Sequence, residues 1–146
     1  MPAIGRDISR RALLLGLCAL PAAAADPAQE VWEVITTLAA ALSRSDPGEF
    51  LSVCDPAMPN YAVLKSNVVA LVAQAEVESG IDPESNAGDD RARDVEADWS
   101  LHLVAKNDLQ QVTRRRETVK CRIEKRGRKW KVAALDPVAL FAPPLP

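Results

Sequence analysis

Apolar and polar residues alternate through much of the C-terminal half of the chain. Between Asp94 and Val104 the alternation is nearly strict, because every second residue is apolar. The apolar face is Val95, Ala97, Trp99, Leu101 and Leu103. A period of two with one polar face is typical of an antiparallel strand that is covered on one side. The same pattern over residues 112–125 and 129–135 predicts two further strands, with a tight turn at Gly127.

Helical spacing of apolar residues precedes the strands. An Asp–Pro pair at residues 26–27 and another at 46–47 are helix-start signals, because Asp caps free N–H groups and Pro suits the first turn. The first pair predicts a helix that ends near Ser45, and the second predicts a short helix. Apolar residues at helical spacing predict a third helix from about 60 to 75.

Three helices followed by a sheet predict a segregated α+β domain. Residues 76–81 are expected to add a strand, which gives an antiparallel sheet of three to four strands. The acidic, turn-rich segment 82–90 is expected to be a loop. The helices are expected to cover the apolar face around Trp99, because no other part of the chain is apolar enough. The tail at 142–146, with three prolines, is expected to be extended.

The first 25 residues differ from the rest. Arg6, Arg10 and Arg11 precede a short apolar run, Ala12–Ala25, which ends in an Ala-x-Ala pattern. This is typical of a secretory signal peptide, and the run is short for a membrane span. The alternative is a buried N-terminal helix. We therefore expect an exported, periplasmic or secreted product that is free of the membrane after cleavage before Asp26.

Two details of this segment bear on the export route and on the product. The adjacent arginines also resemble a twin-arginine signal. Cys18 follows a large leucine, and a large residue at that position is unfavourable for a lipoprotein site. We therefore favour simple cleavage over lipidation at Cys18. The length of 146 residues indicates one domain, which we place at 26–141.

The order of elements resembles the nuclear-transport-factor-2-like superfamily, whose cone-shaped, cystatin-like fold is shared with ketosteroid isomerases and SnoaL-type polyketide cyclases. The residues that carry the resemblance are 57–59 before the third helix, Asp98–Trp99 in the long strand, and above all the closing segment 128–137. The resemblance covers nearly all of the chain after residue 25 and implies helices packed on a curved antiparallel sheet. The superfamily contains enzymes, ligand binders and interaction modules, so the fold leaves the function open.

The polar faces of the strands suggest how the outer surface of the sheet is used. The strand around Asp98 carries acids, whereas the strand around Arg116 carries bases. Set side by side they would form cross-strand ion pairs. The chain has a net charge of −2, so we favour a self-neutralised face over a nucleic-acid patch and expect no nucleic acid as partner. The resemblance also implies a possible homodimer through this face, with a polar interface.

Motifs for metals, cofactors and nucleophilic catalysis are missing from the sequence. His102 is the single histidine, and there is neither a Cys-x-x-Cys pair nor a glycine-rich phosphate loop. We expect no metal and no cofactor. Cys54 and Cys121 are expected to lie near each other, either as a disulfide or as two buried thiols, and the sequence leaves both alternatives open.

The resemblance implies that an enzyme of this type would work inside the cone. The inward face of the long strand is entirely apolar, so the remaining candidates for catalysis are Tyr61 and Glu117. Our first hypothesis is an exported, non-enzymatic domain. It would bind a small apolar ligand in the cone, near Tyr61, Trp99, Leu101 and Cys121, or a protein partner through the sheet. The alternative is an isomerase- or cyclase-like enzyme that uses Tyr61 and Glu117.

Overall fold

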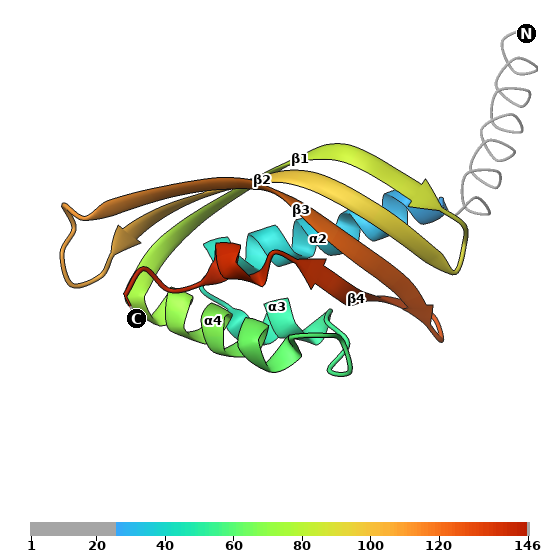
Figure 1. Ribbon diagram of the computed structural model, residues 1–146, viewed down its shortest axis with the longest axis horizontal. Helices are drawn as coiled ribbons and strands as arrows, with labels where there is room; N and C mark the ends of the chain where they lie inside the picture. The colour runs from blue at the N-terminus through green and yellow to red at the C-terminus, as the bar shows by residue number, and fades with distance from the viewer. Residues whose placement is uncertain (1–25, 146) are drawn as a thin grey trace, which may run out of the picture.

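The computed structural model describes residues 26–145, which form helices on one side of a curved sheet (Figure 1). The helices come first. They are α2 (Pro27–Ser43), α3 (Pro47–Ser52) and α4 (Tyr61–Gln74). Asp26 accepts a hydrogen bond from the Ala28 backbone N–H at 3.1 Å, and Asp46 accepts one from Glu49 at 3.0 Å. Both expected helix starts are therefore confirmed.

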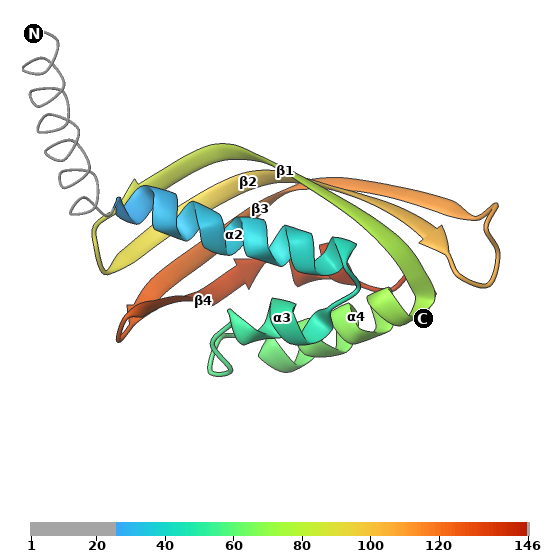
Figure 2. The ribbon, with the colours of Figure 1, turned by 180° about the vertical axis from the view of Figure 1, so that it is seen from behind.

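Four antiparallel strands in the order β1-β2-β3-β4 make the sheet. They are β1 (Ala75–Gly88), β2 (Ala92–Ala105), β3 (Val112–Arg126) and β4 (Lys129–Asp136), followed by the short 3-10 helix η1 (Val138–Phe141). Consecutive strands pair with each other, so the chain runs as a meander. In Figure 2 the helix α2 lies along the concave face of the sheet, and the β2–β3 hairpin extends beyond the helices. This arrangement confirms the α+β prediction.

The predicted loop at 82–90 is wrong, because β1 continues to Gly88 and only residues 89–91 remain for the turn. Pro83 is tolerated because β1 is an edge strand, where a residue without an N–H group need not break a ladder. The register shifts between Pro83 and Ser85. Asn86 then ties the strand to α2 through a 2.8 Å bond to the Ala28 carbonyl.

Gly88 is the residue that lets β1 turn back into β2. Its φ is +149°, and a Cβ atom there would lie 2.3 Å from the Ala92 carbonyl oxygen. No larger residue fits this position without moving the backbone. Asp82 and Glu84, two of the acids that suggested a loop, are therefore exposed side chains of a strand, whereas Asp89 and Asp90 lie in the turn.

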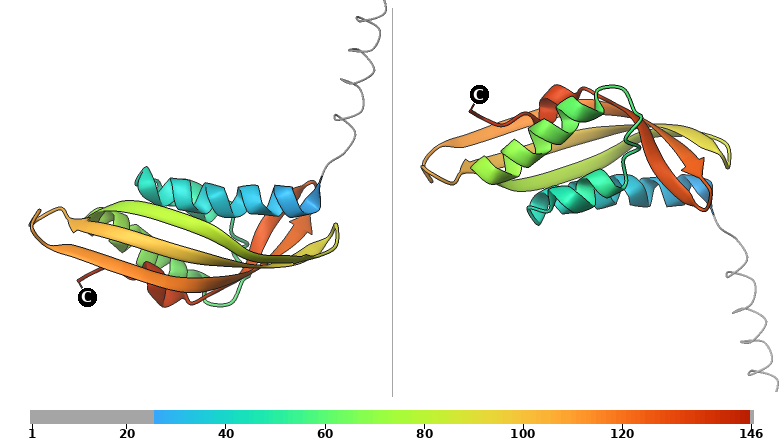
Figure 3. Two further views of the ribbon diagram at one scale, coloured as in Figure 1. Left: turned by 90° about the horizontal axis from the view of Figure 1, so that it is seen from above. Right: turned by 90° about the horizontal axis from the view of Figure 1, so that it is seen from below.

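The inner face of β2 is the centre of the core, as its alternation predicts. Its five apolar side chains, Val95, Ala97, Trp99, Leu101 and Leu103, are all buried. The two views of Figure 3 show α2 beside β1, whereas α4 and η1 lie together over another part of the inner face. Trp99 is fully buried, and its indole N–H donates to the Ser79 hydroxyl at 2.8 Å. The polar group of the largest core side chain is thereby satisfied.

Candidate functional site

The space between the helices and the sheet is filled by an aromatic cluster. Phe141 of η1 meets Trp99 edge to face, with ring centroids 5.1 Å apart and planes at 83°. It also meets Phe50 of α3 at 5.6 Å and 64°. All three side chains are 0% exposed. Edge-to-face pairs of this kind add about 0.5–1.5 kcal/mol beyond the burial of apolar area. The C-terminal segment therefore occupies the interior of the cone.

Polar contacts hold this segment in place. The Arg115 guanidinium donates to the carbonyls of Leu140 at 2.8 Å and Ala142 at 2.5 Å. Asn67 of α4 donates to the Val138 carbonyl at 3.1 Å. Burial lowers the pKa of Arg115, yet arginine stays charged at any ordinary pH. Arg115 therefore binds the backbone carbonyls on both sides of Phe141 and holds η1 against the sheet.

The buried side chains of the described residues are apolar. Among residues 26–145 no polar or charged side chain is buried. The hollows of ligand size around these residues lie at the surface, on the outer sheet face or against the helices. An apolar ligand in the cone would need the space that Phe141 fills.

The two candidates for catalysis, Tyr61 and Glu117, do not line a common pocket. Tyr61 opens α4 and is half-buried against the core, whereas Glu117 is exposed on β3 beyond the end of β4. Neither residue lines the hollow of about 540 Å³ on the outer sheet face or the hollow of about 390 Å³ beside Asn60. The geometry does not combine them as a donor and a general base.

The other predicted site residues are part of the core. Trp99 and Leu101 are buried under the helices and η1, and Cys121 is buried one strand further along. The structure describes Cys54 and Cys121 as free thiols, which matches the second of the two alternatives. Burial raises the pKa of each thiol to about 12. Neutral, buried thiols act here as small apolar side chains.

The outer face of the sheet carries the ion pairs that the charge pattern predicts. Arg116 donates to Asp98 through two nitrogens, with Nε 3.0 Å from each carboxylate oxygen and Nη2 2.5 Å from Oδ2. Arg122 Nη1 lies 3.0 Å from Asp94 Oδ2 across the β2–β3 ladder. The bond from Arg116 lowers the pKa of the Asp98 carboxyl. Acids of β2 thus neutralise bases of β3, which confirms the self-neutralised reading for this part of the face.

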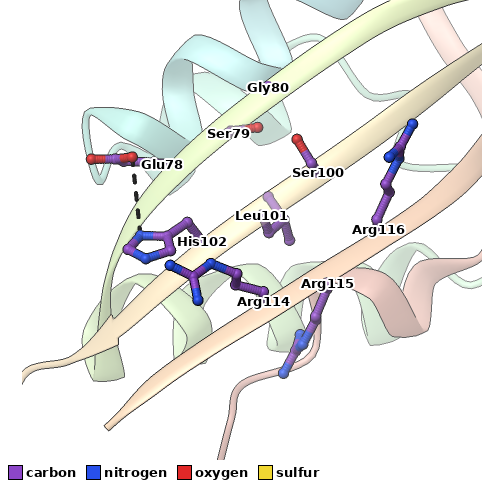
Figure 4. A pocket seen from close by; sticks show the side chains of 9 residues that line it. All are labelled: Glu78, Ser79, Gly80, Ser100, Leu101, His102, Arg114, Arg115 and Arg116. Carbon is purple, nitrogen blue, oxygen red and sulfur yellow. Dashed lines mark ion pairs between the residues drawn. The ribbon is translucent and has the colours of Figure 1, made fainter. Parts of the chain in front are cut away.

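One part of the same face is hollow, and we call it the outer hollow. Its volume is about 540 Å³. Six of the residues that line it are Glu78, Gly80, Ser100, His102, Arg114 and Arg116. Figure 4 shows the Arg114 guanidinium beside the His102 ring, with Arg115 turned away below the sheet. Cross-strand pairing explains the grouping, because Glu78 lies opposite His102 and His102 lies opposite Arg114.

In the sequence His102 was notable only as the single histidine, and no local pattern revealed the outer hollow. Strand β1 contributes Glu78 and Gly80 to the hollow. The register between β1 and β2 places Gly80 opposite Ser100. Both side chains are small, so the surface sinks between His102 and Arg116. The period-two pattern of β1 predicts which of its side chains share the outer face. It does not predict which residue of β2 lies opposite each of them, because that depends on the register.

Neither a metal cluster nor a membrane-spanning helix is found among the described residues. Among residues 26–145, no group of three or more His, Cys, Asp or Glu side chains is placed to hold a metal ion. No helix within these residues has the length and apolar character needed to cross a membrane.

Known proteins resemble this chain in structure rather than in sequence. No family model and no curated protein matches it. A conserved protein from Planctomyces limnophilus superposes with a TM-score of 0.67 at 8% identity, over 73% of this chain and 91% of its own. A ketosteroid isomerase-like protein from Erwinia carotovora atroseptica gives 0.63 at 11%, over 75% and 93%.

A nuclear transport factor 2-like superfamily protein from Salmonella enterica serovar Typhimurium gives a TM-score of 0.61 at 15% identity, over 73% of this chain and 86% of its own. Superpositions of this quality establish the fold, whereas sequence identities this low leave the activity open. The chain has the nuclear-transport-factor-2-like fold, as the resemblance implied.

Replacement of Phe141 tests whether the C-terminal segment fills the cone. Phe141→Ala should lower the free energy of unfolding by about 3–5 kcal/mol, because it leaves a cavity beside Trp99 and Phe50. Chemical denaturation measures this loss. Benzene should then raise the melting temperature of the variant but not of the wild type, since a dry apolar cavity binds such molecules.

Phe141→Leu is the matched control, because it retains most of the apolar volume and should cost less than the alanine variant. A loss below about 1 kcal/mol for Phe141→Ala would contradict the central position of this ring.

The cysteine thiols provide a second test of the core. At pH 8 a thiol with a pKa of about 12 is ionised in only about one molecule in ten thousand. Cys54 and Cys121 in the reduced, folded protein should therefore resist a thiol-specific reagent such as Ellman's reagent and react fully in guanidinium chloride. Stability should also fall as the pH rises above 9, because the unfolded thiols then ionise while the buried ones do not. Rapid labelling of the folded protein would show that this part of the core opens easily.

Proposed function

We propose that this chain is an exported, non-enzymatic binding domain whose recognition surface is the outer face of the sheet. The observation that carries the proposal is the filled cone. Phe141 occupies the interior with Trp99 and Phe50, and none of the described side chains inside is polar and buried. The outer face carries charged groups beside a hollow of about 540 Å³. Pockets of about 300–1,000 Å³ suit small ligands.

The alternative function, an isomerase or cyclase, has less support. It needs an acid and a base that converge on one substrate in a site shielded from water. Glu117 is exposed and Tyr61 is half-buried on another element. The ketosteroid isomerase-like neighbour shares 11% identity with this chain, which supports the fold and gives no reason to transfer an activity.

Export is proposed from the first 25 residues alone. Their basic start, their short apolar run and the Ala-x-Ala pattern before Asp26 are typical of a signal peptide. These residues lie outside the part that the structure describes. A partner of the outer face would then meet the domain outside the cytoplasm. A second copy of the chain is one candidate partner, since charged rows with both signs can pair across a polar interface.

A ligand screen followed by nuclear magnetic resonance tests the binding proposal. A set of small acids, amines and neutral apolar compounds is added to the ¹⁵N-labelled protein. Binders should shift the backbone amides of β1, β2 and β3 around the outer hollow, such as Ser100 and His102. The Trp99 indole N–H and the Phe141 amide report on the interior of the cone and should shift less than these amides. Binders that act mainly on Trp99 and Phe141 would place the site inside the cone and contradict the proposal.

Export predicts a shorter mature protein. After expression of the full chain in a Gram-negative bacterium, the periplasmic fraction should contain a form whose N-terminal residue is Asp26, as measured by intact mass. Arg10→Gln together with Arg11→Gln should trap the precursor inside if the twin-arginine route is used, whereas a general signal should tolerate the pair better. An uncleaved chain confined to the cytoplasm would refute export.

A further inference from the structure

The outer face of the sheet is not evenly neutralised. Along β3, Arg116 is bound by Asp98, and Arg122 is bound by Asp94 and Glu124. Arg114, two residues before Arg116 on the same face, has no carboxylate within 4.0 Å among residues 26–145. Lys120, further along the same face, also has no carboxylate within 4.0 Å among these residues. The balance of acids and bases therefore fails at two positions of β3, and the one at Arg114 lies beside the outer hollow.

Cross-strand register explains this local excess of positive charge. The row that contains Arg114 continues through His102 to Glu78. Glu78 is highly exposed and reaches His102 only at 4.0 Å, from its Oε2 to Nδ1. The next row holds Arg116, Ser100 and Gly80. The acid that pairs with Arg116 comes from β2, and no further carboxylate of the described residues lies close enough to pair with Arg114.

The shape of the hollow follows from the two small residues in the second row. A Cβ atom on Gly80 would lie 3.1 Å from Ser100 Oγ, so glycine keeps the floor open beside the serine hydroxyl. Figure 4 shows Ser100, His102 and Arg114 around this floor. A hydroxyl, an imidazole N–H and a guanidinium can all donate hydrogen bonds, and they come from two adjacent strands.

We propose that the outer hollow binds the anionic group of a small acid, a carboxylate or a phosphate. This assignment rests on the proposed function, since it names the ligand class for the same face. The Arg114 fork matches two oxygens of either group. The Ser100 hydroxyl and one imidazole N–H of His102 supply further donors, and Arg116 contributes positive charge from the rim while it stays bound to Asp98.

The surroundings favour a small acid over a long polyanion. Glu78 and Asp98 border the hollow, and Asp94 and Glu96 continue along β2. A nucleic acid that followed the sheet would meet these carboxylates and be repelled. The acids thus limit the site to a ligand that places one anionic group among the donors.

Titrations with defined anions test the assignment. Inorganic phosphate and succinate are added separately to the ¹⁵N-labelled protein at constant ionic strength, and succinamide serves as the neutral analogue of succinate. At least one anion should shift the amides of Ser100, His102 and Arg114 in a saturable manner, and succinamide should not. Saturation by phosphate alone assigns a phosphate group, and saturation by succinate alone assigns a carboxylate.

Two arginine variants provide the control for charge. Arg114→Gln should weaken anion binding about tenfold or more, which corresponds to the loss of one charge-assisted contact. Arg128→Gln removes the same charge from the exposed β3–β4 turn at the other end of β3 and should leave the affinity unchanged. Gly80→Val should also abolish binding, since its side chain would occupy the floor.

The outcomes separate this inference from the proposed function. Equal weakening by Arg114→Gln and Arg128→Gln, or no saturable shift with either anion, would overturn the anion site. If neutral compounds then bind the outer face, the proposed function stands without it. If binders act only on Trp99 and Phe141, both proposals fail.

Discussion

The edge-to-face contact between Phe141 and Trp99 is the constraint on which the rest of this structure depends. Trp99 comes from the centre of the sheet and Phe141 from the C-terminal end of the chain, with ring centroids 5.1 Å apart. The contact closes the cone with the protein's own side chain. Arg115 stabilises the closure because it donates to two carbonyls of the same segment. A fold that can enclose a ligand is here packed as a core.

Because the cone is closed, the opposite face of the sheet is the surface that we propose for recognition. On a β-strand successive side chains point to opposite faces. Along β2 the apolar side chains therefore pack the core, and the charged side chains between them lie on the outer face. Ion pairs such as Arg116–Asp98 neutralise most of that outer face. Where Gly80 and Ser100 lie opposite each other the face is hollow instead, and Arg114 beside them has no acidic partner among the described residues. Recognition is therefore expected where packing and pairing are both incomplete.

Sequence reasoning succeeded where one period dominates and was wrong where tertiary contacts override local signals. The alternation around Trp99 predicted the strand, its buried face and the α+β class. Proline and acidic residues at 82–90 predicted a loop, yet an edge strand tolerates Pro83 and exposes its acids on one side. The hypothesis of an apolar ligand in the cone relied on the fold. It could not foresee that η1 returns to fill the cone, because no local pattern links Phe141 to Trp99.

The sequence by itself determined the order of helices and strands, the N-caps of the first two helices, and which side of each strand is apolar. These properties depend on neighbours within a few residues, so period and composition reveal them. Only the tertiary structure decided which residues meet across strands and what fills the interior. The row of Glu78, His102 and Arg114 exists because of register. The burial of Phe141 exists because residues more than forty positions apart pack together, and such long-range contacts leave no period in the sequence.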